Sequence, residues 1–178
     1  MIDFKISLEE LDIEIIKIDE DIINILLEQN PEEFTLRKYN IFKERLAGGT
    51  DIRYIGIKNE EILAYIWFTT DEYFESSSGY SSVIDDDTFY IYDVYTMVRH
   101  RKKGYMKDMV YKLLKLFKGM YCDTVLLIID KDNYKSLRTF KFFGFYPVSK
   151  IRTLYYSNKK SPQIVELNDS DLIYFESI

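Results

Sequence analysis

Residues 88–117 read TFYIYDVYTMVRHRKKGYMKDMVYKLLKLF and combine a strand, a cationic turn and a helix. The first eleven residues are rich in Tyr, Val, Ile and Phe, which predicts a β-strand. From Met106 to Phe117 the apolar residues recur at helical spacing, with Asp108 and the lysines on the other side, which predicts an amphipathic helix. Between them, Arg99 to Lys103 can all carry positive charge and Gly104 follows. The cations therefore gather between the end of a strand and the start of a helix.

This cationic turn has properties that suit a phosphate group. The first-turn amides of a helix lack intrahelical acceptors, and the helix dipole favours an anion there. Gly104 allows close approach of the backbone to a ligand, and Arg101, Lys102 and Lys103 add mobile charge. The turn lacks both the Gly-x-Gly-x-x-Gly pattern and the P-loop pattern. Taken alone, it fits a solvated loop and helix face equally well.

The composition narrows the choice of partners and compartment. The 178-residue chain has a formal net charge of −6, whereas residues 99–118 carry eight Lys or Arg and one Asp. A duplex-binding domain usually has a basic balance, so we expect no nucleic-acid partner. One cysteine, Cys122, precludes an internal disulfide and a zinc-type spacing, which favours a cytoplasmic setting. The N-terminus lacks a signal-peptide pattern, and no apolar run reaches membrane-spanning length, so we expect no membrane partner.

The patterns along the whole chain predict a mixed α/β domain. We expect a strand, two helices, a hairpin, a loop, a strand, a helix, a buried strand, a helix and a final strand. Their ranges are 12–19, 20–30, 31–49, 51–70, 71–87, 88–98, 106–118, 123–130, 133–144 and 145–157. Pro31 is expected in the first turn of its helix, and Gly48 and Gly49 at its end. Asp132 or Asn133 is expected to cap the helix at 133–144, and Gly144 to end it. The tail, residues 158–178, is expected to add one short strand around residues 163–167.

A second segment, NYKSLRTFKFFGF at residues 133–145, gives the cationic turn a context. With the turn, it resembles the GNAT superfamily of acyl-CoA-dependent N-acetyltransferases. The family's Arg/Gln-x-x-Gly-x-Gly/Ala loop corresponds to residues 101–106. Its Asn-x-x-Ala-x-x-x-Tyr-x-x-x-Gly-Phe pattern corresponds, with every spacing kept, to Asn133, Ser136, Phe140, Gly144 and Phe145. The resemblance covers residues 88–156 of a single domain expected over 1–178.

The resemblance implies a GNAT-like fold, a V-shaped mixed sheet flanked by helices in which two central strands splay apart. It implies acetyl-CoA in the gap, as co-substrate, and no metal. The implied cofactor-binding residues come from the strand end, the turn and the second segment. They are Thr96, Met97 and Val98, then Arg101, Lys102, Lys103, Gly104, Tyr105 and Met106, then Asn133, Ser136 and Phe140.

The resemblance also implies transfer of an acetyl group to a primary amine by direct attack in a ternary complex. The acceptor, a small-molecule or peptide amine, is left open. Phe140 stands where the family often has a Tyr general acid, and Phe has no proton to give. A non-catalytic domain that binds or senses acyl-CoA is therefore the alternative. The oligomeric state is also open, with a homodimer as one alternative.

The strand before the turn offers the candidate catalytic residues Asp93 and Tyr90. By alternation Tyr90 and Tyr92 share one face and Asp93 lies on the other, unless a bulge intervenes. For Asp93 a structural hydrogen bond is the alternative to catalysis. We favour core packing over a place in the acceptor groove for Trp67. We expect His100 to be a loop residue beside the cofactor rather than a base.

Overall fold

The computed structural model describes residues 11–49, 51–118, 123–157 and 159–178, so Cys122 lies outside the described residues. The described chain forms two compact units. The first holds residues 11–71 and 85–127, and the second holds residues 72–84 and 128–178. The single domain expected over residues 1–178 stays a prediction. In the part of the chain that the structure describes, no helix is long and apolar enough to cross a membrane.

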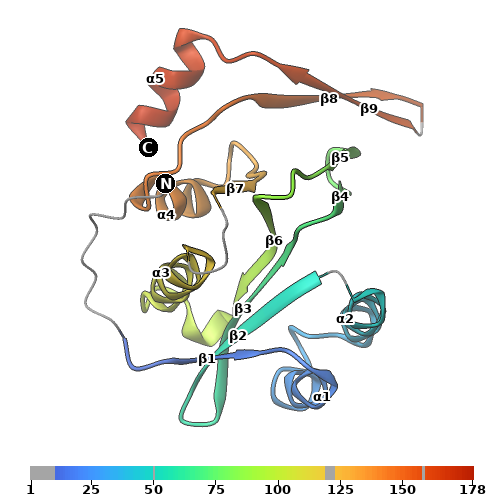
Figure 1. The fold of residues 1–178 in the computed structure, drawn as a ribbon, viewed down its shortest axis with the longest axis vertical. Helices are drawn as coiled ribbons and strands as arrows, with labels where there is room; N and C mark the ends of the chain where they lie inside the picture. Colours follow the sequence, from blue (N-terminus) through green and yellow to red (C-terminus); the bar gives the residue numbers. More distant parts are fainter. Residues whose placement is uncertain (1–10, 50, 119–122, 158) are drawn as a thin grey trace. The chain divides into compact units, whose positions relative to one another are not determined.

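A five-stranded sheet is the centre of the first unit (Figure 1). The strands lie in the order β1-β2-β3-β6-β7, and only β6 and β7 run parallel. They are β1 (Glu14–Lys17), β2 (Asp51–Lys58), β3 (Glu61–Thr69), β6 (Thr88–Thr96) and β7 (Thr124–Leu127). The hairpin expected around KNEE is confirmed as β2–β3. It turns at Asn59 and Glu60, whose positive φ angles of 52° and 64° fit a tight two-residue turn.

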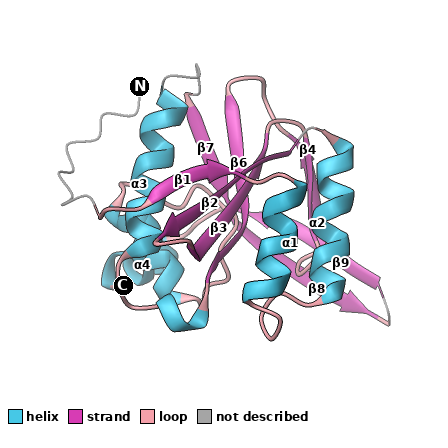
Figure 2. Cartoon of the chain, turned by 90° about the horizontal axis from the view of Figure 1, so that it is seen from below, coloured by secondary structure: helices cyan, strands magenta, loops and turns pink. Residues whose placement is uncertain are grey.

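Two helices, α1 (Glu20–Gln29) and α2 (Leu36–Gly48), cover one face of this sheet (Figure 2). Phe42 of α2 lies edge-on to Tyr65 and Trp67 of β3, with ring centroids 5.1 and 4.6 Å apart. All three side chains are fully buried. Trp67 is therefore a core residue, as we favoured.

The opposite face is covered by α3 (Tyr105–Lys118). Phe117 of α3 lies edge-on to Phe68 and Phe89, with ring centroids 4.4 and 4.7 Å apart. Since Phe68 follows Trp67 in β3, their side chains point to opposite faces. The apolar stripe predicted for this helix is confirmed by its buried members. These are Met109, Val110, Leu113, Leu114 and Phe117.

Asp108 departs from that prediction, which placed it on the polar side of α3. It is 1% exposed. Its Oδ1 accepts from the Leu11 amide at 3.0 Å, and its Oδ2 lies 2.9 Å from Lys112 Nζ. Lys112 Nζ also donates to the Leu11 and Ile13 carbonyls at 2.8 and 2.9 Å. Asp108 and Lys112 thus hold the chain before β1 against α3.

The parallel strands β6 and β7 pair only over a short stretch. Thr88–Ile91 pairs with Thr124–Leu127, whereas β6 continues to Thr96 along β3 alone. β7 is an edge strand of alternating exposed and half-buried residues, and Leu126 is 38% exposed. The prediction that residues 123–130 form a strand buried on both faces is therefore wrong. A strand at the edge of a sheet has a neighbouring strand on one side only, so its side chains meet fewer others on either face than those of an inner strand.

α2 begins at Leu36, not near Pro31 as predicted. The Phe34 amide donates to the Asn30 carbonyl at 2.7 Å, so a separate turn precedes the helix. Thr35 then caps it, with its hydroxyl accepting from the Lys38 amide at 3.4 Å. A side-chain acceptor at the N-cap satisfies an amide that the helix itself leaves unpaired, which explains the later start.

The second unit contains two antiparallel hairpins and two helices. The hairpins are β4 (Glu72–Glu75) with β5 (Tyr80–Val83), and β8 (Lys150–Tyr156) with β9 (Lys159–Val165). The helices are α4 (Tyr134–Phe142) and α5 (Asp169–Ser177). The expected tail strand is present as β9 but begins earlier than residue 163, and α5 follows it.

Segment 71–87 is not the loop that its Ser and Asp content predicted. Its turn at the β4–β5 hairpin is held from β8 and β9. Thr153 Oγ1 donates to the Ser78 carbonyl at 3.0 Å, and Lys160 Nζ donates to the Ser76 and Ser77 carbonyls at 2.6 and 3.1 Å. Contacts with residues distant in the sequence therefore order a stretch whose local composition favours a loop.

Candidate active site

The candidate catalytic residue Asp93 lies at a β-bulge in β6. Tyr65 of β3 pairs with Tyr95, but Trp67 pairs with Tyr92, so β6 has one residue more than β3 over this stretch. Asp93 has a φ of 47°, which Asp and Asn adopt more readily than most residues. The bulge interrupts the alternation and turns the Asp93 carboxylate to the face that Tyr92 also lines.

Arg45 of α2 holds this carboxylate in place. Its Nη1 lies 2.5 Å from Asp93 Oδ2, and the Tyr65 hydroxyl donates to Oδ1 at 3.3 Å. The guanidinium also lies over the rings of Trp67 and Tyr92, 5.0 and 4.9 Å from their centroids. The side chains of Arg45 and Asp93 are 24% and 26% exposed, so the pair is fixed but still reaches solvent.

The tyrosines around Asp93 are hydrogen-bond donors rather than bases. Burial raises the pKa of Tyr65 far above its usual value, and the Asp93 carboxylate raises it further. Burial likewise raises the pKa of Tyr92, and that of Tyr95. These phenols keep their protons at neutral pH. The other candidate, Tyr90, is 2% exposed and stacks on Tyr92 with ring centroids 6.3 Å apart.

Lys38 of α2 places its ammonium group over two stacked rings. Nζ lies 4.4 Å from the Tyr95 centroid and 5.3 Å from the Tyr65 centroid, and the two rings are 5.6 Å apart. Burial lowers the pKa of Lys38, while the nearby Asp93 and Glu33 carboxylates act in the opposite direction. α2 thus brings both a guanidinium and an ammonium to the bulged part of β6.

Glu33, in the turn before α2, connects this helix to the end of β6. Its Oε2 accepts from the Tyr95 hydroxyl and from the Val98 amide, both at 2.9 Å. The carboxylate therefore lies at the backbone segment that the resemblance assigns to the thioester.

The end of β6 is held by backbone and side-chain contacts. β6 ends at Thr96, and the buried Met97 donates its amide to the Leu63 carbonyl at 2.9 Å. A 3-10 turn begins at Val98. The Arg101 Nε donates back to the Thr96 carbonyl at 3.1 Å. Thr96, Met97, Val98 and Arg101 thus lie together at one strand end.

The cationic turn completes the path from β6 to α3. Lys102 and Gly104 have φ angles of 64° and 83°, and the residues from Arg101 to Gly104 are exposed. Tyr105 and Met106 open α3 and are half-buried. The turn therefore presents exposed cations at the first turn of a 14-residue helix, where anions are favoured.

The prediction of His100 as a loop residue beside the cofactor, rather than a base, stays a prediction. His100 lies in the 3-10 turn and is 6% exposed. Its Nε2 accepts from Arg99 Nε at 3.0 Å and lies 3.4 Å from Glu61 Oε2. Burial and the Arg99 charge lower the pKa of His100 below its usual value. The imidazole is therefore neutral at neutral pH and packs beneath the turn.

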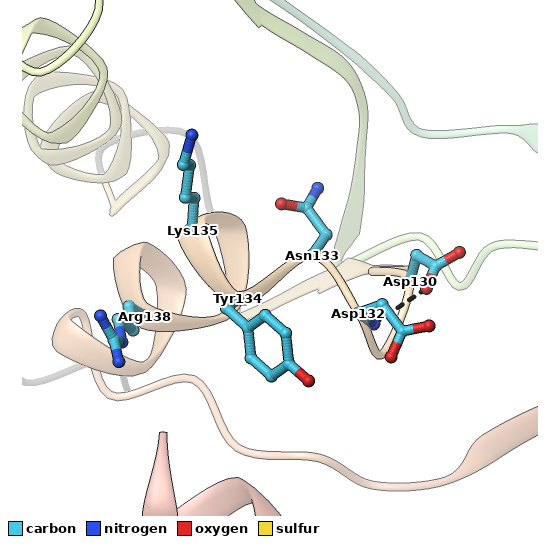
Figure 3. A pocket seen from close by; sticks show the side chains of 6 residues that line it. All are labelled: Asp130, Asp132, Asn133, Tyr134, Lys135 and Arg138. Carbon is cyan, nitrogen blue, oxygen red and sulfur yellow. Dashed lines mark hydrogen bonds between the residues drawn. The ribbon is translucent and has the colours of Figure 1, made fainter.

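The second unit carries Asn133, Ser136 and Phe140. Asn133, one of the two caps that the sequence allowed, caps α4, with its Oδ1 accepting from the Ser136 amide at 3.3 Å. Phe140 is 3% exposed and lies edge-on to Phe145, with ring centroids 5.2 Å apart. An open hollow of about 810 Å³ borders the start of α4 (Figure 3). Its lining residues are Asp130, Asp132, Asn133, Tyr134, Lys135 and Arg138.

Glu33, Lys38 and Arg45 were missed when the site was predicted from sequence. Lys38 and Arg45 are two helical turns apart, so their shared face was a readable signal. Glu33 gave no such signal, because its partners Tyr95 and Val98 lie 62 and 65 residues further along the chain.

Three features together are typical of one class of protein, the acyl-CoA-dependent N-acyltransferases. They are a mixed sheet with one parallel strand pair, a bulge in β6, and a cationic turn that opens a helix. A family model described as the acetyltransferase (GNAT) family matches residues 20–145. The chain therefore belongs to the GNAT acetyltransferase family, and the predicted fold class is confirmed.

Solved structures share this fold at low sequence identity. AAC(6')-Iy, in complex with the bisubstrate analogue CoA-S-monomethyl-acetylneamine, is 12% identical with a TM-score of 0.59, over 84% of this chain and 99% of that one. The aminoglycoside 6'-N-acetyltransferase AAC(6')-Ih from Acinetobacter baumannii is 12% identical with a TM-score of 0.57, over 83% and 98%. A transcriptional regulator from Bacillus halodurans is 18% identical with a TM-score of 0.56, over 81% and 99%. No curated protein matches the chain.

Proposed function

We propose that the protein transfers an acetyl group from acetyl-CoA to a primary amine by direct attack in a ternary complex. One observation carries the proposal: β6 combines a bulged, partly exposed carboxylate at Asp93 with a strand end that leads into the cationic turn. Membership of the GNAT family, which uses acetyl-CoA, supports the choice of co-substrate. We assign the protein to the cytoplasm, with a small-molecule or peptide amine as acceptor.

The proposed cofactor contacts follow the chain from the strand end to α4. In our proposal the backbone of Thr96, Met97 and Val98 lies along the pantetheine arm. The Val98 amide, which donates to Glu33 Oε2 in this structure, turns to the thioester carbonyl and polarises it. The pyrophosphate binds at the first turn of α3, to the amides and side chains of residues 101–106. The resemblance also assigns Asn133, which caps α4, and Ser136 and Phe140 of α4 to the cofactor, and we keep this assignment as part of the proposal.

The reaction requires little from the protein beyond orientation of the two reactants and proton transfer. A thioester already reacts with a free amine, so the enzyme chiefly holds the two together and stabilises the developing oxyanion. In our proposal Asp93 removes the proton from the acceptor ammonium, directly or through water. We give Tyr90 no part in proton transfer because it is 2% exposed. CoA leaves as a thiolate, which a thiol pKa of about 8.5 makes feasible without a general acid.

Calorimetry with acetyl-CoA, followed by release of free CoA in the presence of an amine panel, tests the proposal. The panel holds polyamines, amino sugars, amino acids and basic peptides. We expect binding and turnover of at least one class. Absence of both would contradict the assignment.

A non-catalytic acyl-CoA sensor is the second candidate, and Phe140 is the observation that favours it. The side chain is buried and offers no proton at the position where the family often has Tyr. Tight binding of acetyl-CoA without turnover of any amine, unchanged in Phe140→Tyr, would support the sensor. Turnover by the unaltered protein would exclude it.

A further inference from the structure

Lys38 is an amine beside the proposed reaction centre that the proposed function does not use. We propose that the protein acetylates its own Lys38 Nζ from bound acetyl-CoA, so that this lysine is a built-in acceptor and modification site. The inference rests on the proposed function, because the acetyl donor must first bind at the end of β6.

The position of Lys38 is the first argument. Its Nζ lies 4.4 Å from the centroid of Tyr95, the residue that precedes the segment assigned to the thioester. The Tyr95 hydroxyl and the Val98 amide share one acceptor, Glu33 Oε2, at 2.9 Å each. The side chains of Tyr95 and Glu33 thus connect the Lys38 ammonium group to the Val98 amide. A lysine side chain has a flexible four-carbon stem, so Nζ can move while α2 fixes the Cα of Lys38.

The surroundings of Lys38 are the second argument. Among the described residues its ammonium group has no hydrogen-bond or ion-pair partner and lies only on the faces of Tyr65 and Tyr95. Burial and the Arg45 guanidinium favour the neutral amine, whereas Asp93 and Glu33 favour the charged form. Burial is the largest of these effects, so the pKa of Lys38 is lowered. At a given pH, a larger fraction of Lys38 is therefore in the nucleophilic free-amine form.

The same helix provides a matched control in Lys43. Its ammonium pairs with the Glu20 carboxylate at 2.6 Å, and its side chain is 44% exposed. This pairing raises the pKa of Lys43. Lys43 is therefore more accessible than Lys38 to reagents in solution but less nucleophilic. Among the described residues its ammonium contacts Glu20 and the Tyr39 ring, not β6.

The proposed step balances without any further reactant. The Lys38 ammonium loses one proton to Asp93 or to water, and the neutral Nζ attacks the thioester carbonyl carbon. The new C–N bond forms and the C–S bond breaks. The second proton on nitrogen passes to the departing thiolate. The products are acetyl-Lys38, CoA thiol and one proton.

The purified full chain is incubated with acetyl-CoA alone, and acetylation of Lys38 and Lys43 is followed by peptide mass spectrometry. We expect Lys38 to react at least about tenfold faster than Lys43, because bound donor and amine are held together. The first-order rate should be independent of protein concentration. A parallel incubation with acetyl phosphate, which lacks the CoA moiety, should remove most of the preference for Lys38, because only the difference in basicity between the two amines then remains. Lys38→Arg should abolish the modification at this position, and Lys43→Arg should leave it unchanged.

Equal preference for Lys38 with both donors would overturn the inference, because basicity alone would then explain the modification. Calorimetry in the same samples distinguishes failure of the Lys38 inference from failure of the proposed function. Binding of acetyl-CoA without acetylation of Lys38 would overturn the inference and leave the proposed function intact. Failure of acetyl-CoA to bind would overturn both.

Discussion

Arg45 Nη1 lies 2.5 Å from Asp93 Oδ2, and this contact joins α2 to the bulge of β6. The bulge decides which face of the sheet Asp93 occupies, and the guanidinium fixes the orientation of its carboxylate on that face. Trp67 and Tyr92 lie beneath the guanidinium and limit its movement. We therefore regard Arg45 as a positioning residue that acts through Asp93.

Asp93→Asn should lower kcat by about 100-fold if Asp93 removes the acceptor proton. Asn keeps the shape of the side chain and tolerates the φ of 47°, so the fold should be retained. Steady-state kinetics with the acceptor found in the amine panel give kcat, and circular dichroism checks the fold. An unchanged kcat in a folded Asp93→Asn protein would assign Asp93 a structural role only.

Arg45→Met should destabilise the fold by about 1–3 kcal/mol, because it leaves the Asp93 carboxylate without its charged partner. Because Arg45 acts by positioning Asp93, its loss should lower kcat while the KM for acetyl-CoA stays close to that of the unaltered protein. Arg45→Lys should recover part of kcat, because it restores the charge. Urea unfolding and steady-state kinetics measure both effects. A higher KM for acetyl-CoA with unchanged kcat would show that Arg45 does not act through Asp93.

Gly104→Val should weaken acetyl-CoA binding by about tenfold or more, equivalent to about 1.4 kcal/mol. Gly104 has a φ of 83°, which β-branched residues avoid, so the substitution shifts the turn whose amides are proposed to hold the pyrophosphate. Gly49→Val is the matched control, since Gly49 has a φ of 78° at the end of α2. Calorimetry should show weak binding only for Gly104→Val. Equal affinity in both variants would remove the turn from the cofactor site.

Local patterns predicted the parts of the fold that local interactions determine. The amphipathic period of α3 and the cap of α4 at Asn133 are visible within a dozen residues, and both are confirmed. The face of Asp93 could not be predicted, because the bulge exists only in the pairing of β6 with β3. The burial of Asp108 depends on Leu11, which lies 97 residues away.

In the candidate site, too, the features set by local sequence were predicted and those set by contacts between distant segments were not. The strand end and the cationic turn were predicted because the family pattern is contiguous there. The network around Asp93 was missed because Lys38 and Arg45 come from α2 and Glu33 from the turn before it, and neither segment carries the family patterns read from the sequence. Only the packing of α2 on the sheet brings these charges to β6.

Asp108→Ala should destabilise the fold by about 3 kcal/mol, because it leaves the partly buried Lys112 ammonium without its carboxylate. It also removes the acceptor of the Leu11 amide. Asp108→Asn keeps an acceptor at Oδ1 and should cost less. Urea unfolding of the three proteins measures the difference. Equal stability in all three would show that these contacts do not stabilise the chain before β1.

His100 should make the fold less stable as the solution becomes mildly acidic. Burial and Arg99 lower its pKa in the folded chain below the ordinary value of 6.5. Below that value the unfolded chain binds a proton that the folded chain resists, so stability is complete above about pH 6.5 and falls as the pH decreases, by at most about 1.4 kcal/mol per pH unit. His100→Gln removes this contribution, and the chain has no other histidine. Urea unfolding between about pH 7.5 and about pH 5 should therefore give a steeper decline for the unaltered protein than for His100→Gln. Parallel declines, or an imidazole NMR titration with a midpoint above 6.5, would show that the folded chain does not resist this proton.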